Sequence, residues 1–123
     1  MVRSVHGGIA TTFERILHAI AKDEAAALAC KRLLLPLQRE DAERGNNLVT
    51  TLRSYYACGL RVDKTAERMF LHRNSVRYRL DRARALLGLD IDDPATSATL
   101  IAAFAVDLAA TKNEETQHAT ERA

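Results

Sequence analysis

Apolar residues recur at intervals of three and four along most of the chain, and no stretch shows the alternation of a β-strand. Thr11 and Glu14 have the spacing of a helix-capping box, which predicts a first helix from this point. Its apolar stripe comprises Phe13, Ile16, Leu17 and Ile20. The stripe continues less regularly from Leu28 to Leu35. Pro36 is expected to end or kink this helix, because proline disfavours helix at the preceding residue.

A second helix is expected after a polar turn from Gln38 to Gly45. Asn46 or Asn47 is placed to cap its N-terminus, since asparagine is among the preferred N-cap residues. Its buried stripe comprises Leu48, Leu52 and Tyr55. The Cys58-Gly59 pair closes the helix, because glycine readily adopts the left-handed turn beyond a helix end.

Two short helices follow, separated only by residues 70–72, which is the spacing of a helix-turn-helix motif. The first is expected over residues 64–69, with Asp63 as its N-cap. The second is closed by Gly88 and buries one apolar face. That face comprises Val76, Leu80, Ala83 and Leu87.

These two helices need a small side chain where they cross, because the turn between them is so short. Ala66 supplies it, and Val76 is placed at the same junction on the second helix. Met69 and Leu71 flank the turn as apolar anchors. This pattern is more specific than two adjacent amphipathic helices, which also occur in many proteins that never bind DNA.

The last helix is expected to begin at Asp93-Pro94, an N-cap followed by proline at the first helical position. Leu89 and Ile91, just before it, are expected to fold back onto the core. The inward-facing residues of the last helix are expected to be Ser97, Leu100, Ile101, Phe104 and Leu108. The predicted fold class is all-α, a helix-turn-helix with a trihelical core, an extra N-terminal helix and a C-terminal helix.

Composition fits one modest core, because the 123 residues are 47% hydrophobic and 28% charged. We expect an N-terminal helical extension over residues 1–30, a helix-turn-helix domain over 31–111, and a polar, disordered tail over 112–123. The sequence has no continuous run of about eighteen apolar residues and no signal peptide. The protein is therefore expected to be cytoplasmic and to bind no membrane.

Charge is distributed unevenly along the chain. The formal net charge is +2, but residues 61–84 hold eight basic and three acidic side chains, so this segment alone carries +5 and the rest of the chain −3. Such asymmetry favours a polyanion-binding segment on a mildly acidic body.

The second helix of the motif presents a polar, mainly cationic face opposite Val76. Asn74, Arg77 and Tyr78 lie on that face, and arginine and asparagine can each make paired hydrogen bonds to guanine or adenine. Better suited to phosphate are Arg73, Arg82 and Arg84. Arg79 borders the buried face, where a packing or ion-pair role is as compatible with the pattern as DNA contact. His72 is placed to touch phosphate, to cap the helix or to do neither.

No residues in the sequence form a recognisable catalytic or metal-binding set. Cys30 and Cys58 stand 28 residues apart without a Cys or His at metal-ligand spacing, so we interpret them as reduced, part-buried side chains. Paired carboxylates, a Ser/His/Asp set and a phosphate-binding glycine loop are also absent. We therefore expect a protein that is not an enzyme and needs no cofactor and no metal.

Three segments carry a family resemblance: RLLLPLQREDAERGNNLVTTLRSYYACG at residues 32–59, HRNSVRYRL at 72–80, and GLDIDDP at 88–94. Over about eighty residues the chain resembles the C-terminal helix-turn-helix domain of the PucR/CdaR-type bacterial transcriptional regulators. Residues 66–80 are also similar, more loosely, to the Fis-type helix-turn-helix. Departures from the PucR-like pattern are Leu60 in place of Gly, Arg61 in place of Asn, and the bulky Phe70 at the turn.

The resemblance implies sequence-specific DNA binding by a dimer or larger oligomer, under the control of an upstream sensory region. Only about thirty residues precede the match, so that region is expected to be missing here. The DNA-contacting positions that the resemblance implies are Arg73, Asn74, Ser75, Arg77, Tyr78 and Arg79.

The leading hypothesis is a DNA-binding transcriptional regulator, or the DNA-binding portion of one, whose recognition helix at about residues 73–87 enters the major groove of double-stranded DNA. The alternative is a helical protein–protein interaction module that keeps the fold without binding DNA. The basic outer face favours DNA. A homodimer is expected, and the stripe from Phe13 to Ile20 is either its interface or part of the core.

Overall fold

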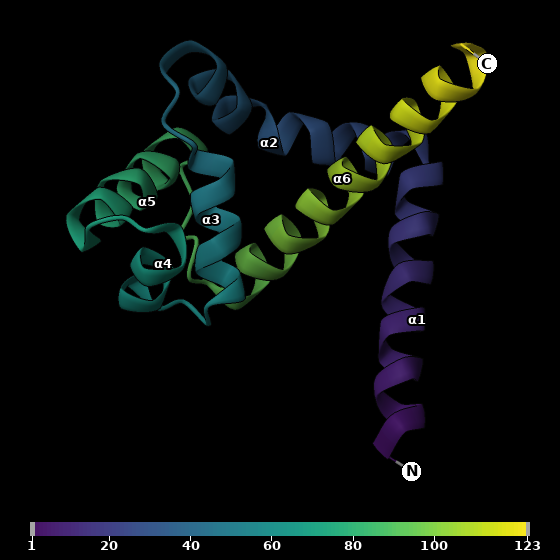
Figure 1. Ribbon diagram of the computed structural model, residues 1–123, viewed down its shortest axis with the longest axis horizontal. Helices are drawn as coiled ribbons and strands as arrows, with labels where there is room; N and C mark the ends of the chain where they lie inside the picture. Colours follow the sequence, from purple (N-terminus) through teal and green to yellow (C-terminus); the bar gives the residue numbers. More distant parts are fainter. Residues whose placement is uncertain (1, 123) are drawn as a thin grey trace. The chain divides into compact units, whose positions relative to one another are not determined.

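The computed structural model describes the backbone of residues 2–122 and the side chains of residues 8–111. All the regular elements of the described chain are helices and none is a strand, which confirms the all-α class (Figure 1). The helices are α1 (Val2–Lys22), α2 (Glu24–Arg44), α3 (Leu48–Ala57), α4 (Val62–Met69), α5 (Arg73–Leu87) and α6 (Pro94–Arg122). They form two compact units, one of residues 32–101 and one of residues 1–31 with 102–123.

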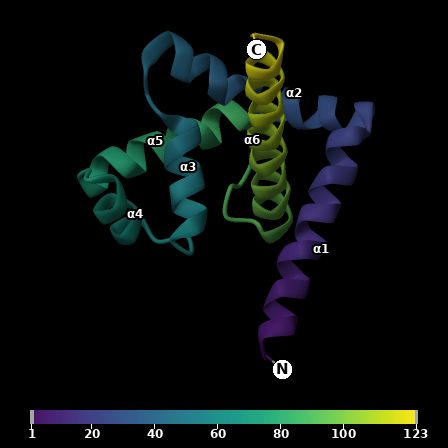
Figure 2. The same cartoon turned by 45° about the vertical axis from the view of Figure 1, so that its right-hand side comes forward.

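The unit of residues 32–101 is built on α3, α4 and α5, which pack pairwise on one another and are seen together in Figures 1 and 2. The predicted stripe of α3 is buried at Leu48, Leu52 and Tyr55. The predicted face of α5 is buried at Val76, Leu80 and Ala83. Leu87 is only half-buried. The trihelical core is therefore the one that the hydrophobic pattern predicts.

The start of α3 lies where it was predicted, but its capping group is different. Asn47 is the N-cap residue in a left-handed conformation, with φ 53°, and its side chain makes no capping hydrogen bond. The carboxylate of Asp41, from α2, accepts hydrogen bonds from the backbone N–H groups of Leu48 at 2.6 Å and Val49 at 3.1 Å. The cap therefore comes from the preceding helix.

The predicted boundaries of the first helix are wrong. Thr11 lies inside α1, so it caps nothing, and a break at Asp23 separates α1 from α2. The predicted polar turn at residues 38–45 is also wrong, because α2 continues through Pro36 as far as Arg44. A proline inside a helix costs about 3 kcal/mol, and the burial of Leu34 and Leu37 on either side of it offsets that cost.

The helix-turn-helix pair forms with one correction at its start. The N-cap of α4 is Arg61 rather than Asp63. Asp63 lies in the first turn of α4, and its carboxylate forms an ion pair with Arg61 at 3.0 Å. Ala66 and Val76 are both buried, and α4 and α5 pack against each other. The crossing therefore uses the small and β-branched residues that were predicted.

Asp93 caps α6 as expected, accepting hydrogen bonds from the backbone N–H of Thr96 at 3.1 Å and from its hydroxyl at 3.2 Å. Of the residues predicted to face inward, Leu100 and Phe104 are buried, whereas Ile101 and Leu108 are exposed. Small residues that the prediction passed over, Ala103 and Val106, are buried instead.

The segment before α6 matches the prediction in part. Ile91 is fully buried, whereas Leu89 is exposed. The predicted polar, disordered tail at 112–123 falls on residues whose side chains lie outside the described range, and it stays a prediction.

Part of α6, Pro94–Thr111, is long and apolar enough to cross a membrane by length and composition alone. The sequence reading did not single it out. Such a helix is weak evidence of a membrane span, because core helices of soluble proteins pass the same test, and Leu100 and Phe104 are buried within the protein.

Candidate nucleic-acid interface

Helix α5, the second helix of the helix-turn-helix pair, begins with a side-chain cap. His72 has an extended backbone and its Nδ1 accepts a hydrogen bond from the backbone N–H of Asn74 at 3.0 Å. Of the three roles left open for His72, the structure supports capping. This cap fixes the direction in which the first turn of α5 points.

The turn before α5 is tight and exposes an aromatic ring. Phe70 is left-handed, with φ 55°, and 95% of its surface is exposed. The backbone N–H of Leu71 bonds to the carbonyl of Ala66 at 2.9 Å, which closes the end of α4. The turn and His72 therefore hold the N-terminus of α5 at the surface of the trihelical core.

Five of the eight predicted contact residues lie together on the exposed N-terminal half of α5. They are Arg73, Asn74, Ser75, Arg77 and Tyr78. Arg73 and Arg77 form no ion pair or side-chain hydrogen bond with any other residue whose side chain is described. Their charges are therefore available to a ligand in this part of the structure.

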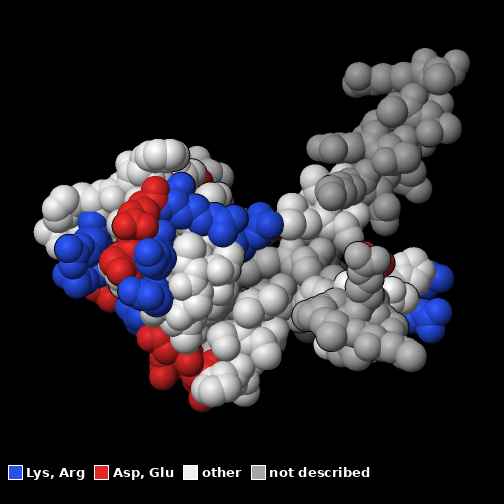
Figure 3. All heavy atoms as spheres, turned by 60° about the horizontal axis from the view of Figure 1, so that its bottom comes forward, with Lys and Arg blue, Asp and Glu red and all other residues white. Residues whose placement is uncertain are grey.

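The other three predicted residues have partners within the protein. Arg79 is half-buried, and its Nη1 lies 3.3 Å from the hydroxyl of Thr51 in α3. Arg84 pairs with Asp81 at 2.8 Å and more loosely with Asp92 at 3.4 Å. Basic and acidic side chains accordingly lie next to each other over α3 to α5 in Figure 3, so the +5 segment is not a uniformly positive surface.

Arg82 makes the strongest of these contacts. Its Nε donates to Oε2 of Glu40 at 2.6 Å, and its Nη2 donates to Oε1 at 2.9 Å. Glu40 is only 6% exposed and also accepts a hydrogen bond from Asn46 at 2.9 Å. Hydrogen bonding to Arg82, opposed by burial and assisted by Asn46, lowers the pKa of Glu40 to about 2.

The sequence reading missed Glu40 because it assigned residues 38–45 to a turn. No local signal marks this residue, and only the continuation of α2 to Arg44 places its carboxylate beside α5.

A second set of contacts, also missed from sequence, fastens the segment after α5. The hydroxyl of Tyr55 donates to Asp92 at 2.8 Å, and that of Tyr56 donates to the carbonyl of Ile91 at 2.9 Å. Burial, with the hydrogen bond to Asp92, raises the pKa of Tyr55 to about 12. The two hydroxyl groups therefore hold residues 91–92, which follow α5, against α3.

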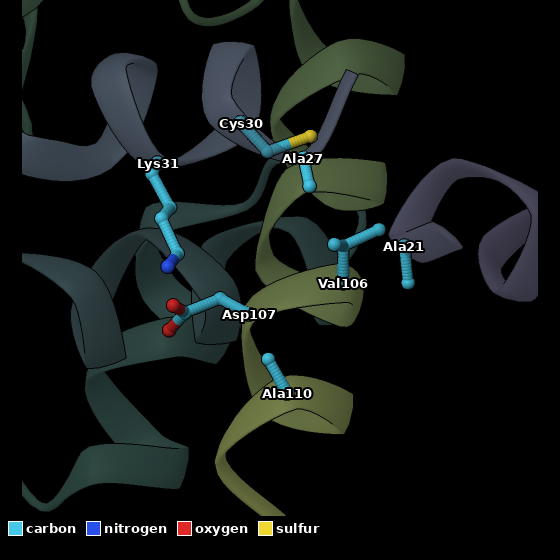
Figure 4. A pocket seen from close by; sticks show the side chains of 7 residues that line it. All are labelled: Ala21, Ala27, Cys30, Lys31, Val106, Asp107 and Ala110. Atoms are coloured by element: carbon cyan, nitrogen blue, oxygen red, sulfur yellow. The ribbon is translucent and has the colours of Figure 1, made fainter. Parts of the chain in front are cut away.

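A small pocket in the other unit, shown in Figure 4, is lined by Cys30 and Val106 among others. The side chains of Lys31 and Asp107 point toward one another beside it. Its volume of about 50 Å³ is far below the roughly 300 Å³ of a typical small-molecule site. Among the residues with described side chains, no group of three or more His, Cys, Asp or Glu could hold a metal ion.

Comparison with known proteins bears on the same region. An uncharacterised protein of Thermomonospora curvata is 40% identical over 78 residues, which are 63% of this chain and 43% of that protein. The purine catabolism regulatory protein of Bacillus subtilis is 30% identical over 112 residues, 80% of this chain and 20% of that protein. An uncharacterised protein of Mycobacterium tuberculosis is 34% identical over 88 residues, 72% of this chain and 20% of that protein.

The chain thus spans between a fifth and just over two fifths of the length of these relatives. No solved structure is significantly similar to it. The family described as the PucR C-terminal helix-turn-helix domain matches residues 48–106, a range that holds α3, α4, α5 and the first part of α6. Residues 48–106 of this chain are therefore a helix-turn-helix domain of the PucR C-terminal family.

Proposed function

We propose that this chain is the DNA-binding portion of a transcriptional regulator, acts in the cytoplasm, and reads the major groove of duplex DNA with the N-terminal half of α5. The observation that carries the proposal is the exposed group of Arg73, Asn74, Ser75, Arg77 and Tyr78 at the start of a helix capped by His72. An α-helix fits the major groove, and its N-terminal residues are the ones that reach the base edges in helix-turn-helix proteins. Binding, not catalysis, is the proposed activity.

The exposed residues have different chemical capacities. Asn74 and Arg77 suit base edges, because asparagine pairs with adenine and arginine with guanine. Arg73 lies at the first position of α5, where its cation suits phosphate. Ser75 and Tyr78 add hydroxyl donors that suit either target.

Arg79 and Arg84 remain in the proposed set as phosphate contacts. The partner of Arg79, a threonine hydroxyl, is neutral, so the charge of Arg79 is not compensated. The partners of Arg84 are exposed carboxylates, with Asp81 at 74% and Asp92 at 43% exposure. Surface ion pairs contribute only about 0 to 1 kcal/mol, so phosphate can replace them.

We also propose that a homodimer forms through α1. Ile9, Phe13 and Ile16 are exposed and follow one another at steps of four and three, which is the spacing of a coiled-coil seam. Leu17 and Ile20, the other two residues of the predicted stripe, are half-buried, so only the exposed part of the stripe supports an interface and core packing remains the alternative for the rest.

The experiment that tests DNA binding is a salt titration of the whole chain with duplex DNA. If about four phosphates are neutralised, log K falls against log salt with a slope of roughly −3 to −4. Selection of bound sites from a random pool then supplies the preferred sequence. Absence of binding at low salt, or a flat slope, overturns the proposal.

A further inference from the structure

The ion pair between Glu40 and Arg82 joins α2 to the middle of the recognition helix across 42 positions of the chain. It uses two N–H groups of the guanidinium and both oxygens of the carboxylate, at 2.6 Å and 2.9 Å. Bidentate pairs of this kind are the strong form of the arginine–carboxylate interaction. The pair therefore cancels one of the positive charges of α5.

Burial makes this pair different from the other ion pairs of α5. Glu40 is 6% exposed, whereas the carboxylates that pair with Arg84 are open to solvent. If Arg82 moved to a phosphate, the carboxylate of Glu40 would keep the hydrogen bond from Asn46 and only a long contact of 3.9 Å with the exposed Arg44. A buried carboxylate that loses its directly bonded cation is destabilised, because an exposed arginine at this distance compensates its charge only weakly. A solvent-exposed contact with phosphate gives less in return, because exposed ion pairs contribute little.

We infer that Glu40 is a positioning residue that keeps Arg82 on the protein and away from DNA phosphates, so that α5 binds DNA of any sequence less tightly than its arginine content implies. This inference rests on the proposed function and revises one predicted contact, Arg82. It also gives the C-terminal part of α2 a role in setting the charge that α5 presents. The N-terminal half of α5, with Arg73 and Arg77, is left to bind DNA.

The test compares Glu40→Gln with Glu43→Gln by salt titration on a random-sequence duplex. Each variant removes one negative charge from α2, so the long-range effects of charge on DNA binding are matched. The variants differ in that Glu43 is exposed and makes no ion pair with a described residue. Glu40→Gln frees Arg82, and the slope of log K against log salt should become steeper by about 0.9, the contribution of one further phosphate contact. Glu43→Gln should leave the slope unchanged. Equal slopes for the two variants overturn the inference.

A second variant covers the case in which Glu40→Gln unfolds. Replacing a buried ion pair by apolar residues of similar volume is often neutral or stabilising, so Glu40→Leu combined with Arg82→Met should stay folded. Its slope on random DNA should equal that of the parent chain, because Arg82 makes no phosphate contact in the parent. A slope shallower by about 0.9 shows that Arg82 does contact phosphate and overturns the inference. If the parent chain binds no DNA, the proposed function itself is overturned. This titration of the parent chain is done before either variant is made.

Discussion

Arg77 is the side chain on which sequence preference should depend most. It is exposed at the second turn of α5 and has no partner among the described side chains. Arg77→Ala should cost about 1 to 3 kcal/mol on the selected site and less on random DNA, because a bidentate contact to guanine is lost only where guanine is present. Competition titrations on the two duplexes measure both losses.

The matched control for Arg77→Ala is Arg84→Ala, which removes the same charge from the same helix. Its exposed partners and its place on the flank suit phosphate, so it should weaken binding to both duplexes alike. Equal losses on the two duplexes for Arg77→Ala would show that Arg77 does not read bases.

Glu40 makes folding stability depend on pH in acid. Its pKa in the folded chain is about 2, below the ordinary value of 4.5, so its ionised form is favoured by folding. Its contribution is fully present above about 4.5 and is lost as the pH falls toward about 2. Thermal melting should therefore give a higher Tm for the parent than for Glu40→Gln. The difference between the two Tm values should become smaller as the pH falls through this range. A gap that stays constant between these pH values contradicts the assigned pKa.

At the scale of the elements, the crossing of α4 and α5 should resist enlargement. Ala66 is buried on α4, so Ala66→Leu forces extra carbons into the junction near Val76. Overpacking of this kind typically costs about 1 to 3 kcal/mol. Urea unfolding of Ala66→Leu against Ala42→Leu, an exposed position on α2, measures the cost. Equal midpoints for the two variants would show that Ala66 does not lie at a tight crossing.

The elements that the sequence predicted well are those whose ends are marked locally. Gly59 and Gly88 adopt φ values of 68° and 66° beyond the ends of α3 and α5, and glycine is the residue that favours this conformation. The continuation of α2 through Pro36 could not be seen in the same way, because it depends on the burial of Leu34 and Leu37 in the folded unit.

The candidate site shows the same division. A helical wheel places Asn74, Arg77 and Tyr78 on the outer face of α5, and these side chains are exposed. The wheel also places Arg82 there, although α2 supplies a carboxylate to it. A pattern within one helix carries no information about a partner 42 residues earlier, so this contact was beyond sequence reasoning.

The whole molecule is expected to act as a dimer, since one reading helix covers too few base pairs for useful specificity. We expect two half-sites about one helical turn apart. Ile16→Glu places a charge in the proposed seam of α1 and should give a monomer by sedimentation, whereas His18→Glu, also exposed on α1, should leave the dimer intact. A chain starting at Lys31 should be monomeric for the same reason. A parent chain that is monomeric with DNA present overturns the dimer.

The ion pair between Glu40 and Arg82 also affects the order in which the chain folds. Helices α3, α4 and α5 are neighbours in sequence and pack on one another, and proteins rich in such local contacts fold within microseconds to milliseconds. The ion pair closes a loop of 42 positions, whose entropy cost favours its formation after the transition state. Glu40→Gln should therefore speed unfolding in stopped-flow experiments and leave the refolding rate unchanged. The ion pair that limits DNA affinity would then also lengthen the lifetime of the folded domain, because it slows unfolding.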